Sequence, residues 1–173
     1  MISGLRRRQV ETEEELYDVA LRALMRRAHS IQEMKKTLLR YTRNQLLVRV
    51  VLARLTENGQ LNDERFAQQF ARNRAQSRKQ GQFRIQRELR ARGVSDSIIQ
   101  STLAEAVAEC DPALLVRQRI ERKLKALGGA IDEKKIASIA ASLLRAGFPT
   151  DLIRSELQRF TSKEVPAADA AED

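Results

Sequence analysis

Apolar residues of this chain recur at two fixed spacings, and this internal repetition constrains the fold more than any other feature. Five positions are matched 51 residues later, namely Met34 by Ile85, Leu38 by Leu89, Leu47 by Ile98, Val48 by Ile99 and Leu52 by Leu103. Five are matched again after 54 residues, namely Leu89 by Leu143, Gly93 by Gly147, Ile98 by Leu152, Ile99 by Ile153 and Leu103 by Leu157. Repeats of about 50 residues indicate tandem structural units that pack mainly against their neighbours.

Each repeat holds three stretches of helical periodicity, so the sequence predicts an all-α fold of three tandem three-helix repeats that form an elongated, curved body. The predicted helix N-caps are Ser30, Asp63, Ser95, Asp111, Asp132 and Thr150. Gly93 and Gly147 suit the left-handed position after a helix. The predicted helices of the first repeat span about 13–28, 30–38 and 44–57, and the last helix of the chain spans 152–160. The predicted organisation is a flexible basic N-terminal arm at 1–12, repeats at 13–59, 60–108 and 109–160, and a disordered tail at 161–173.

Net charge, cysteine content and hydropathy limit the possible partners and the compartment of the protein. The 173 residues carry a net charge of +9, which favours nucleic acid, an anionic membrane surface or an acidic protein face as partner; the alternative is that the basic residues only solvate helices. Cys110 is the single cysteine, so an intramolecular disulfide is impossible and a reducing compartment is indicated. Neither a signal-peptide core nor an apolar run of about 18 residues is present, and a soluble cytoplasmic protein is therefore expected.

Catalytic patterns are missing. No glycine-rich phosphate-binding motif occurs, and His29 is the only histidine, which we interpret as a helix-end residue. The acidic pairs at 63–64 and 132–133 fall in first helical turns, where they favour the helix dipole rather than a metal. We therefore predict no enzymatic activity, no catalytic residue, no cofactor and no metal site.

Basic residues are concentrated in the middle repeat. From Arg65 to Arg92 nine Lys or Arg face a single acid, Glu88. A second concentration lies between Ala20 and Arg54, and the third repeat adds Arg117, Arg119, Arg122, Lys123 and Lys125. Such a basic stripe suits a long polyanion or a helical groove. The candidate binding residues are Arg72, Arg74, Arg78, Lys79, Arg84, Arg87, Arg90, Arg26, Arg27, Lys35 and Lys36.

Three segments of the chain carry motifs in a fixed order. Residues 61–67 read LNDERFA, and the same motif continues with Gly81, Arg84, Ile85, Glu88, Leu89, Arg92 and Gly93. The first repeat has a motif made of Ala20, Leu21, Leu24, Arg27, His29, Ser30, Glu33 and Leu38, and residues 143–148 of the third repeat read LLRAGF. In this order and spacing the three segments resemble the RecX family of RecA regulators. Gln80 stands where many members carry an aromatic residue, and Met34 replaces the usual Leu.

The resemblance implies a non-enzymatic modulator, mainly an inhibitor, that binds along the groove of RecA filaments on single-stranded DNA. It would restrain the ATPase, co-protease and strand-exchange activities of RecA in recombination, DNA repair and the SOS response. The expected partners are the RecA filament and single-stranded or double-stranded DNA, with no membrane. The absence of a surplus apolar stripe favours a monomer. The alternative is a general single-stranded or double-stranded DNA-binding helical-repeat protein. Sequence-specific reading of a duplex is less favoured, because it normally requires a dimer and the chain offers no coiled-coil heptads to form one.

Overall fold

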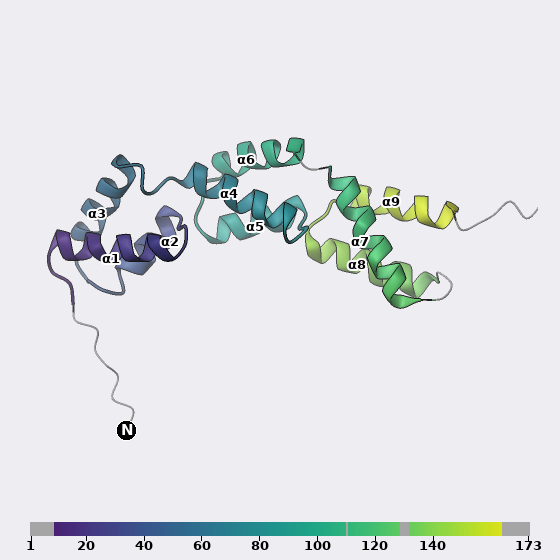
Figure 1. The fold of residues 1–173 in the computed structure, drawn as a ribbon, viewed down its shortest axis with the longest axis horizontal. Helices are drawn as coiled ribbons and strands as arrows, with labels where there is room; N and C mark the ends of the chain where they lie inside the picture. The colour runs from purple at the N-terminus through teal and green to yellow at the C-terminus, as the bar shows by residue number, and fades with distance from the viewer. Residues whose placement is uncertain (1–8, 110, 129–131, 164–173) are drawn as a thin grey trace, which may run out of the picture. The chain divides into compact units, whose positions relative to one another are not determined.

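The computed structural model describes residues 9–109, 111–128 and 132–163, without the side chains of 106–109, 162 and 163. Within these ranges every regular element is an α-helix, and the helices follow one another in three groups of three (Figure 1). They are α1 (Glu13–Arg26), α2 (Ile31–Leu38), α3 (Gln45–Glu57), α4 (Asp63–Gln76), α5 (Gln82–Ala91), α6 (Asp96–Glu109), α7 (Pro112–Leu127), α8 (Glu133–Ala146) and α9 (Thr150–Lys163). The expected all-α tandem repetition is confirmed. Cys110, most of the predicted arm and most of the predicted tail lie outside the described residues.

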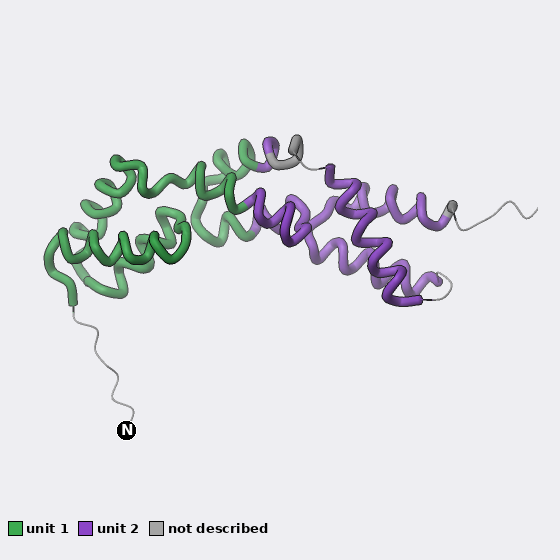
Figure 2. The backbone as a smooth tube through the Cα atoms, viewed as in Figure 1, with its two compact units in different colours: residues 1–70, 88–102 green, residues 71–87, 103–173 purple. Residues whose placement is uncertain are grey.

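Two compact units make up the chain, and the division between them passes through the middle repeat (Figure 2). Unit 1 comprises residues 1–70 and 88–102, and unit 2 comprises residues 71–87 and 103–173. Helices α4, α5 and α6 therefore contribute residues to both units. The predicted curvature of the whole body and the predicted repeat boundaries stay predictions.

The core of unit 1 is formed by the apolar stripes of the first three helices. It consists of Leu16, Val19, Ala20, Met34, Leu38, Val48, Val51, Leu52, Leu55 and Leu61. Burying a side chain of this size stabilises a fold by about 1.5–3 kcal/mol. Val10 also packs against this core, and its N–H donates to the Tyr41 carbonyl at 2.9 Å. The end of the predicted arm is thus anchored, whereas the sequence indicated little to bury there.

The core of unit 2 joins α7, α8 and α9. Its buried members are Val116, Ile120, Ile139, Leu143, Ala146, Phe148 and Ile153. Glu156 is only 2% exposed beside this core, and it forms ion pairs with Arg117 at 2.7 Å and with Arg159 at 3.2 Å. A buried carboxylate needs such partners because desolvation of an isolated charge is costly.

A junction inside unit 1 joins the start of α2 to the end of α5. Ser30 caps α2 by accepting from the Glu33 N–H at 3.1 Å, and its hydroxyl donates to the Arg92 carbonyl at 2.6 Å. Gly93 has φ +77°, and a Cβ added there would lie 2.5 Å from the Cβ of Gln32. Only glycine satisfies both the backbone conformation and the close approach.

Unit 2 contains an equivalent junction, between the start of α5 and the end of α8. The Gly81 and Phe83 N–H groups donate to the carbonyls of Ala146 and Gly147, at 2.8 and 3.0 Å. Gly81 follows Ser30 by the 51-residue spacing, and Gly147 follows Gly93 by the 54-residue spacing. The two spacings therefore mark the same kind of contact, in which the positive end of one middle helix meets the negative end of the next.

The structure corrects two predicted helix starts. Asn62, and not Asp63, caps α4, because the Asn62 Oδ1 accepts from the Arg65 N–H at 2.8 Å. The Asp63 carboxylate instead accepts from the Ile31 N–H at 2.9 Å and so satisfies an open donor of α2. The second correction concerns Thr150, which was predicted to cap a helix over 152–160. Thr150 is instead the first residue of α9, and the Pro149 carbonyl accepts from the Ile153 N–H.

Three predicted caps agree with the structure, whereas the predicted end of the last helix does not. The caps at Ser30, Asp111 and Asp132 are confirmed. Helix α9 continues to Lys163, beyond the predicted end at Phe160, and the Thr161 hydroxyl donates to the Gln158 carbonyl at 3.0 Å.

Candidate functional site

The connection between α4 and α5 holds a basic residue in an unfavourable backbone conformation. Lys79 has φ +49°, a left-handed conformation that costs about 1–2 kcal/mol for a residue with a Cβ atom. Neighbouring contacts stabilise it: the Lys79 Nζ donates to the Gln118 side-chain oxygen on α7, and the Gln80 N–H donates to the Arg74 carbonyl at 3.0 Å. The Arg78 carbonyl also accepts from the Arg119 Nη2 at 3.0 Å. The connection is thereby fixed against α7.

Arg119 lies half-buried at the centre of this region. Its guanidinium carbon is 6.0 Å from the centre of the Phe148 ring, and its buried Nε has no hydrogen-bond partner among the described residues. Burial, followed by the charges of Arg122 and Arg84, lowers the pKa of Arg119. Arginine nevertheless stays protonated at physiological pH because its ordinary pKa lies far above that pH. The folded chain therefore holds together cations that repel one another in a partly desolvated place, and a bound anion would relieve this repulsion.

Lys79, Arg84, Arg119 and Arg122 together form what we name the unit 2 basic cluster. Beside it lies an open hollow of about 440 Å³, which is lined by Lys79, Gln118, Glu121, Arg122 and Lys125. Guanidinium groups bind phosphate and carboxylate through charge-assisted hydrogen bonds that are about twice as strong as neutral ones. The cluster is thus suited to bind an anionic group of a larger partner.

Two of the predicted binding residues, Lys79 and Arg84, belong to this cluster. Arg78 adjoins it through its backbone, while Arg72 and Arg87 are exposed on α4 and α5. Arg74 is half-buried. Arg90 is part of unit 1, where its Nε lies 2.6 Å from the Asp96 carboxylate.

The predicted binding residues of the first repeat are all exposed, but they differ in their contacts. Arg27 forms an ion pair with Glu33 at 2.8 Å, so its charge is largely balanced inside unit 1. Arg26 lies in the last turn of α1, and Lys35 and Lys36 lie in the last turn of α2.

Arg92 shows that a basic residue of the family motif can serve the fold. Its guanidinium carbon lies 4.5 Å from the centre of the Phe70 ring, and its Nη1 donates to the Glu88 carbonyl at 2.8 Å. Its Nε is 3.6 Å from Glu33. Arg92 adds to the positive charge of the middle repeat, but its contacts stabilise the junction between α2 and α5.

Arg119 and Arg122 belong to the basic residues of the third repeat, but they were not among the predicted binding residues. They lie 35 and 38 residues after Arg84, and no local pattern brings such distant positions together. The sequence nevertheless held one signal for this region. Gly81 lies 51 residues after Ser30, and Gly147 lies 54 residues after Gly93, so the repetition indicates that the start of α5 meets the end of α8. Arg84, which contacts Gly147, lies at this meeting point.

The described part of the chain holds neither a membrane-spanning helix nor a cluster of metal ligands. None of its helices is long and apolar enough to cross a membrane. No group of three or more His, Cys, Asp or Glu side chains lies there in a position to hold a metal ion.

Comparisons with known proteins identify relatives over most of the chain. Residues 62–103 match the family model described as RecX, second three-helix domain. The chain is 39% identical to the regulatory protein RecX of Halorhodospira halophila over 142 residues, which cover 82% of this chain and 86% of that protein. It is 30% identical to the regulatory protein RecX of Chlorobaculum tepidum, with 88% and 92% covered. The crystal structure of RecX from Lactobacillus salivarius superimposes with a TM-score of 0.76 at 20% identity, covering 87% of this chain and 97% of that one.

Proposed function

Since the chain belongs to the RecX family of regulatory proteins, we propose that it regulates the RecA recombinase, mainly as an inhibitor, by binding in the groove of the RecA filament on single-stranded DNA. Binding there restrains the ATPase, co-protease and strand-exchange activities of RecA. The observation that carries the proposal is the match to relatives named regulatory protein RecX over more than four fifths of this chain.

The unit 2 basic cluster supplies a physical basis for binding. Arg84 and Arg122 lie close enough to Arg119 to lower its pKa, so an anionic group beside Arg119 would be attracted by more than one positive charge. DNA phosphates and carboxylates of a protein surface both meet this requirement. In this proposal the protein acts by occupying the groove and performs no chemical step.

The decisive experiment measures the single-stranded-DNA-dependent ATPase of RecA from the same organism. The protein is titrated well below one copy per RecA, at two salt concentrations and with excess competitor DNA. We expect inhibition that persists in the presence of competitor, because the filament should bind the protein more tightly than free DNA does. Loss of inhibition on addition of competitor would instead favour a general DNA-binding helical-repeat protein.

A matched pair of variants tests the role of the cluster. Arg84→Gln with Arg122→Gln removes two cluster charges, and Lys134→Gln with Arg154→Gln removes two exposed charges of unit 2 outside the cluster. We expect the first variant to require about tenfold more protein for half-inhibition and to show a weaker dependence on salt, since each lost phosphate contact reduces the salt slope by about 0.7–0.9. Equal losses in both variants would show that only net charge matters.

A further inference from the structure

Unit 1 contains a hollow of about 470 Å³ whose walls are strongly basic. Its lining includes Arg22, Arg26, Arg27, His29, Arg40 and Tyr41. These residues come from the second half of α1, the α1–α2 connection and the segment after α2. We name it the unit 1 hollow. A volume of this size is typical of pockets for small ligands, which range from about 300 to 1,000 Å³.

The positive charge of the unit 1 hollow is not balanced from within. Arg27 is already bonded to Glu33 at 2.8 Å, and Glu33 also faces Arg92 at 3.6 Å. None of the ion pairs or side-chain hydrogen bonds among the described residues uses the guanidinium groups of Arg22, Arg26 or Arg40. Glu33 therefore does not neutralise the remaining arginines.

The negative ends of two helix dipoles balance only part of the arginine charge around the hollow. The C-terminal ends of α1 and α2 lie near the hollow, and each carries about half a negative charge, which attracts cations. Four arginines still leave an excess of about two positive charges after Glu33 and both dipoles are included. Arg22 and Arg26 are also four residues apart on α1, where like charges destabilise a helix by about 0.2–0.5 kcal/mol. Asp18, four residues before Arg22, offsets part of this effect but does not line the hollow. An anionic ligand would offset both effects.

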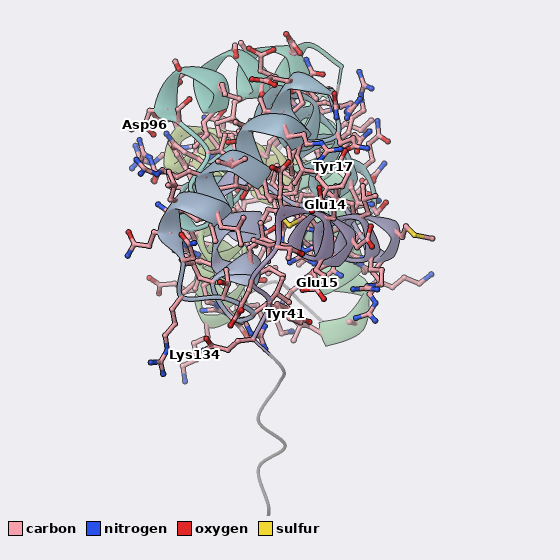
Figure 3. The ribbon with its side chains drawn as sticks, turned by 90° about the vertical axis from the view of Figure 1, so that its left-hand side faces the viewer. Glu14, Glu15, Tyr17, Tyr41, Asp96 and Lys134 are labelled. Carbon is pink, nitrogen blue, oxygen red and sulfur yellow. The ribbon has the colours of Figure 1, made fainter. Side chains whose placement is uncertain are left out.

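Tyr41 gives the hollow an aromatic wall. It lies in the segment after α2, below the labelled Glu14 and Glu15 of α1 in Figure 3, and its carbonyl accepts from the Val10 N–H at 2.9 Å. The half-buried Tyr41 side chain also packs against the core of unit 1, so the fold sets its position before any ligand arrives. Nucleobases stack on such rings with about 1–3 kcal/mol of stabilisation per base, whereas a carboxylate gains nothing comparable from one.

We propose that the unit 1 hollow is a nucleotide-binding site, in which Arg22, Arg26 and Arg40 bind the phosphate and the ring of Tyr41 contacts the base. Arginine suits this role because its planar fork matches two phosphate oxygens at once. The nucleotide can belong to a single strand or be free in solution, since both present the same phosphate ester and base. This inference goes beyond the proposed function, and its test needs no RecA.

The test measures fluorescence anisotropy of the full-length protein with two probes, a labelled oligothymidylate and a fluorescent ATP analogue without metal. Arg22→Gln with Arg26→Gln is compared with Arg43→Gln with Arg49→Gln, which removes the same charge from exposed positions of unit 1 outside the lining. We expect the first variant to weaken binding about tenfold or more, because charge-assisted hydrogen bonds are lost, and the second to weaken it less than twofold. Binding of the ATP analogue identifies a free nucleotide as a ligand, and binding of the oligothymidylate alone identifies a strand.

Two further measurements keep the proposal falsifiable. Tyr41→Phe keeps the ring and should bind as the wild type does, whereas Tyr41→Leu should weaken binding of both probes severalfold at unchanged helicity. Binding is measured well below the thermal midpoint of each variant, because Tyr41 also packs against the core of unit 1. Equal weakening in the two arginine variants, or no binding of either probe, would overturn the proposal. Stronger competition by polyglutamate than by an oligonucleotide of equal charge would also overturn it, since the hollow would then select carboxylates.

Discussion

Single side chains of this protein have roles that depend on their burial more than on their type. His29 is 8% exposed, and its Nδ1 lies 2.9 Å from the Arg27 carbonyl, which can only accept. Nδ1 therefore carries the proton in the neutral ring. Burial is the main cause that lowers the pKa of His29 below 6.5, with a further contribution from Arg27, although the hydrogen bond to the Arg27 carbonyl and the charge of Glu33 oppose it.

His29 should consequently make unfolding dependent on pH. With a lowered folded pKa, the unfolded chain binds a proton that the folded chain does not, so stability decreases as pH falls below the unfolded pKa of about 6.5. We expect His29→Gln to reduce the loss of stability between about pH 7.5 and pH 5.5. Urea unfolding of both proteins at the two pH values measures this. An equal loss in both proteins would contradict the assignment.

Asp63 offers a test with the opposite sign. Burial, and secondarily Glu33, raises the pKa of Asp63, while the Ile31 N–H opposes the rise. The stability that comes from a raised carboxyl pKa is present below the unfolded value and is lost as pH rises through the folded value. At neutral pH the Asp63 charge is therefore a cost, although its oxygen still serves α2.

We accordingly expect Asp63→Asn, which keeps an acceptor oxygen, to be at least as stable as the wild type at pH 7. Asp63→Ala should be less stable by about 1 kcal/mol, the usual cost of a lost helix cap. Urea unfolding at neutral pH and at about pH 4, near the ordinary pKa of the group, measures both variants. The advantage of Asp63→Asn should vanish at the lower pH; a large loss in Asp63→Asn at pH 7 would show that the charge itself stabilises the junction.

At the scale of helices, the two junctions explain why particular glycines stand where they do. A Cβ on Gly81 would lie 2.3 Å from the Gly147 carbonyl carbon and oxygen, which are backbone atoms that cannot move away independently. Gly59 has φ +66°, but an added Cβ there would meet nothing within 4 Å. One glycine is thus needed for space and the other only for conformation.

This difference predicts the effect of two alanine substitutions. Gly59→Ala should cost about 1 kcal/mol, from the left-handed conformation alone. Gly81→Ala should cost about 3 kcal/mol or more, because α5 must move away from α8 and lose the hydrogen bonds to Ala146 and Gly147. Chemical denaturation gives the free energies, and amide hydrogen exchange at Phe83 should rise only in Gly81→Ala. Similar costs for both substitutions would contradict the close approach.

At the scale of the whole chain, the net charge of +9 implies that basic side chains repel one another in the folded state. Added salt screens this repulsion, since the Debye length falls from about 30 Å at 0.01 M to about 3 Å at 1 M. The free energy of unfolding should therefore rise with sodium chloride. Arg84→Gln with Arg122→Gln should show a smaller rise than Lys134→Gln with Arg154→Gln, because the first pair belongs to a concentrated cluster. Indistinguishable salt responses would mean that the cluster is not a centre of repulsion.

The sequence by itself determined the helices, their repetition and the glycines that end α5 and α8, because caps, apolar spacing and positive φ depend on neighbours within a few residues. It also located the basic middle repeat. Only the tertiary structure decided which cations meet: Arg119 and Arg122 join Arg84, whereas Arg27 and Arg92 are bonded to Glu33. It likewise assigned Asp63 to α2 and not to α4. The approach of Arg84 to Arg119, of Arg92 to Glu33 and of Asp63 to α2 depends on contacts between residues more than 30 positions apart, where burial and charge, and not local spacing, set the free energy.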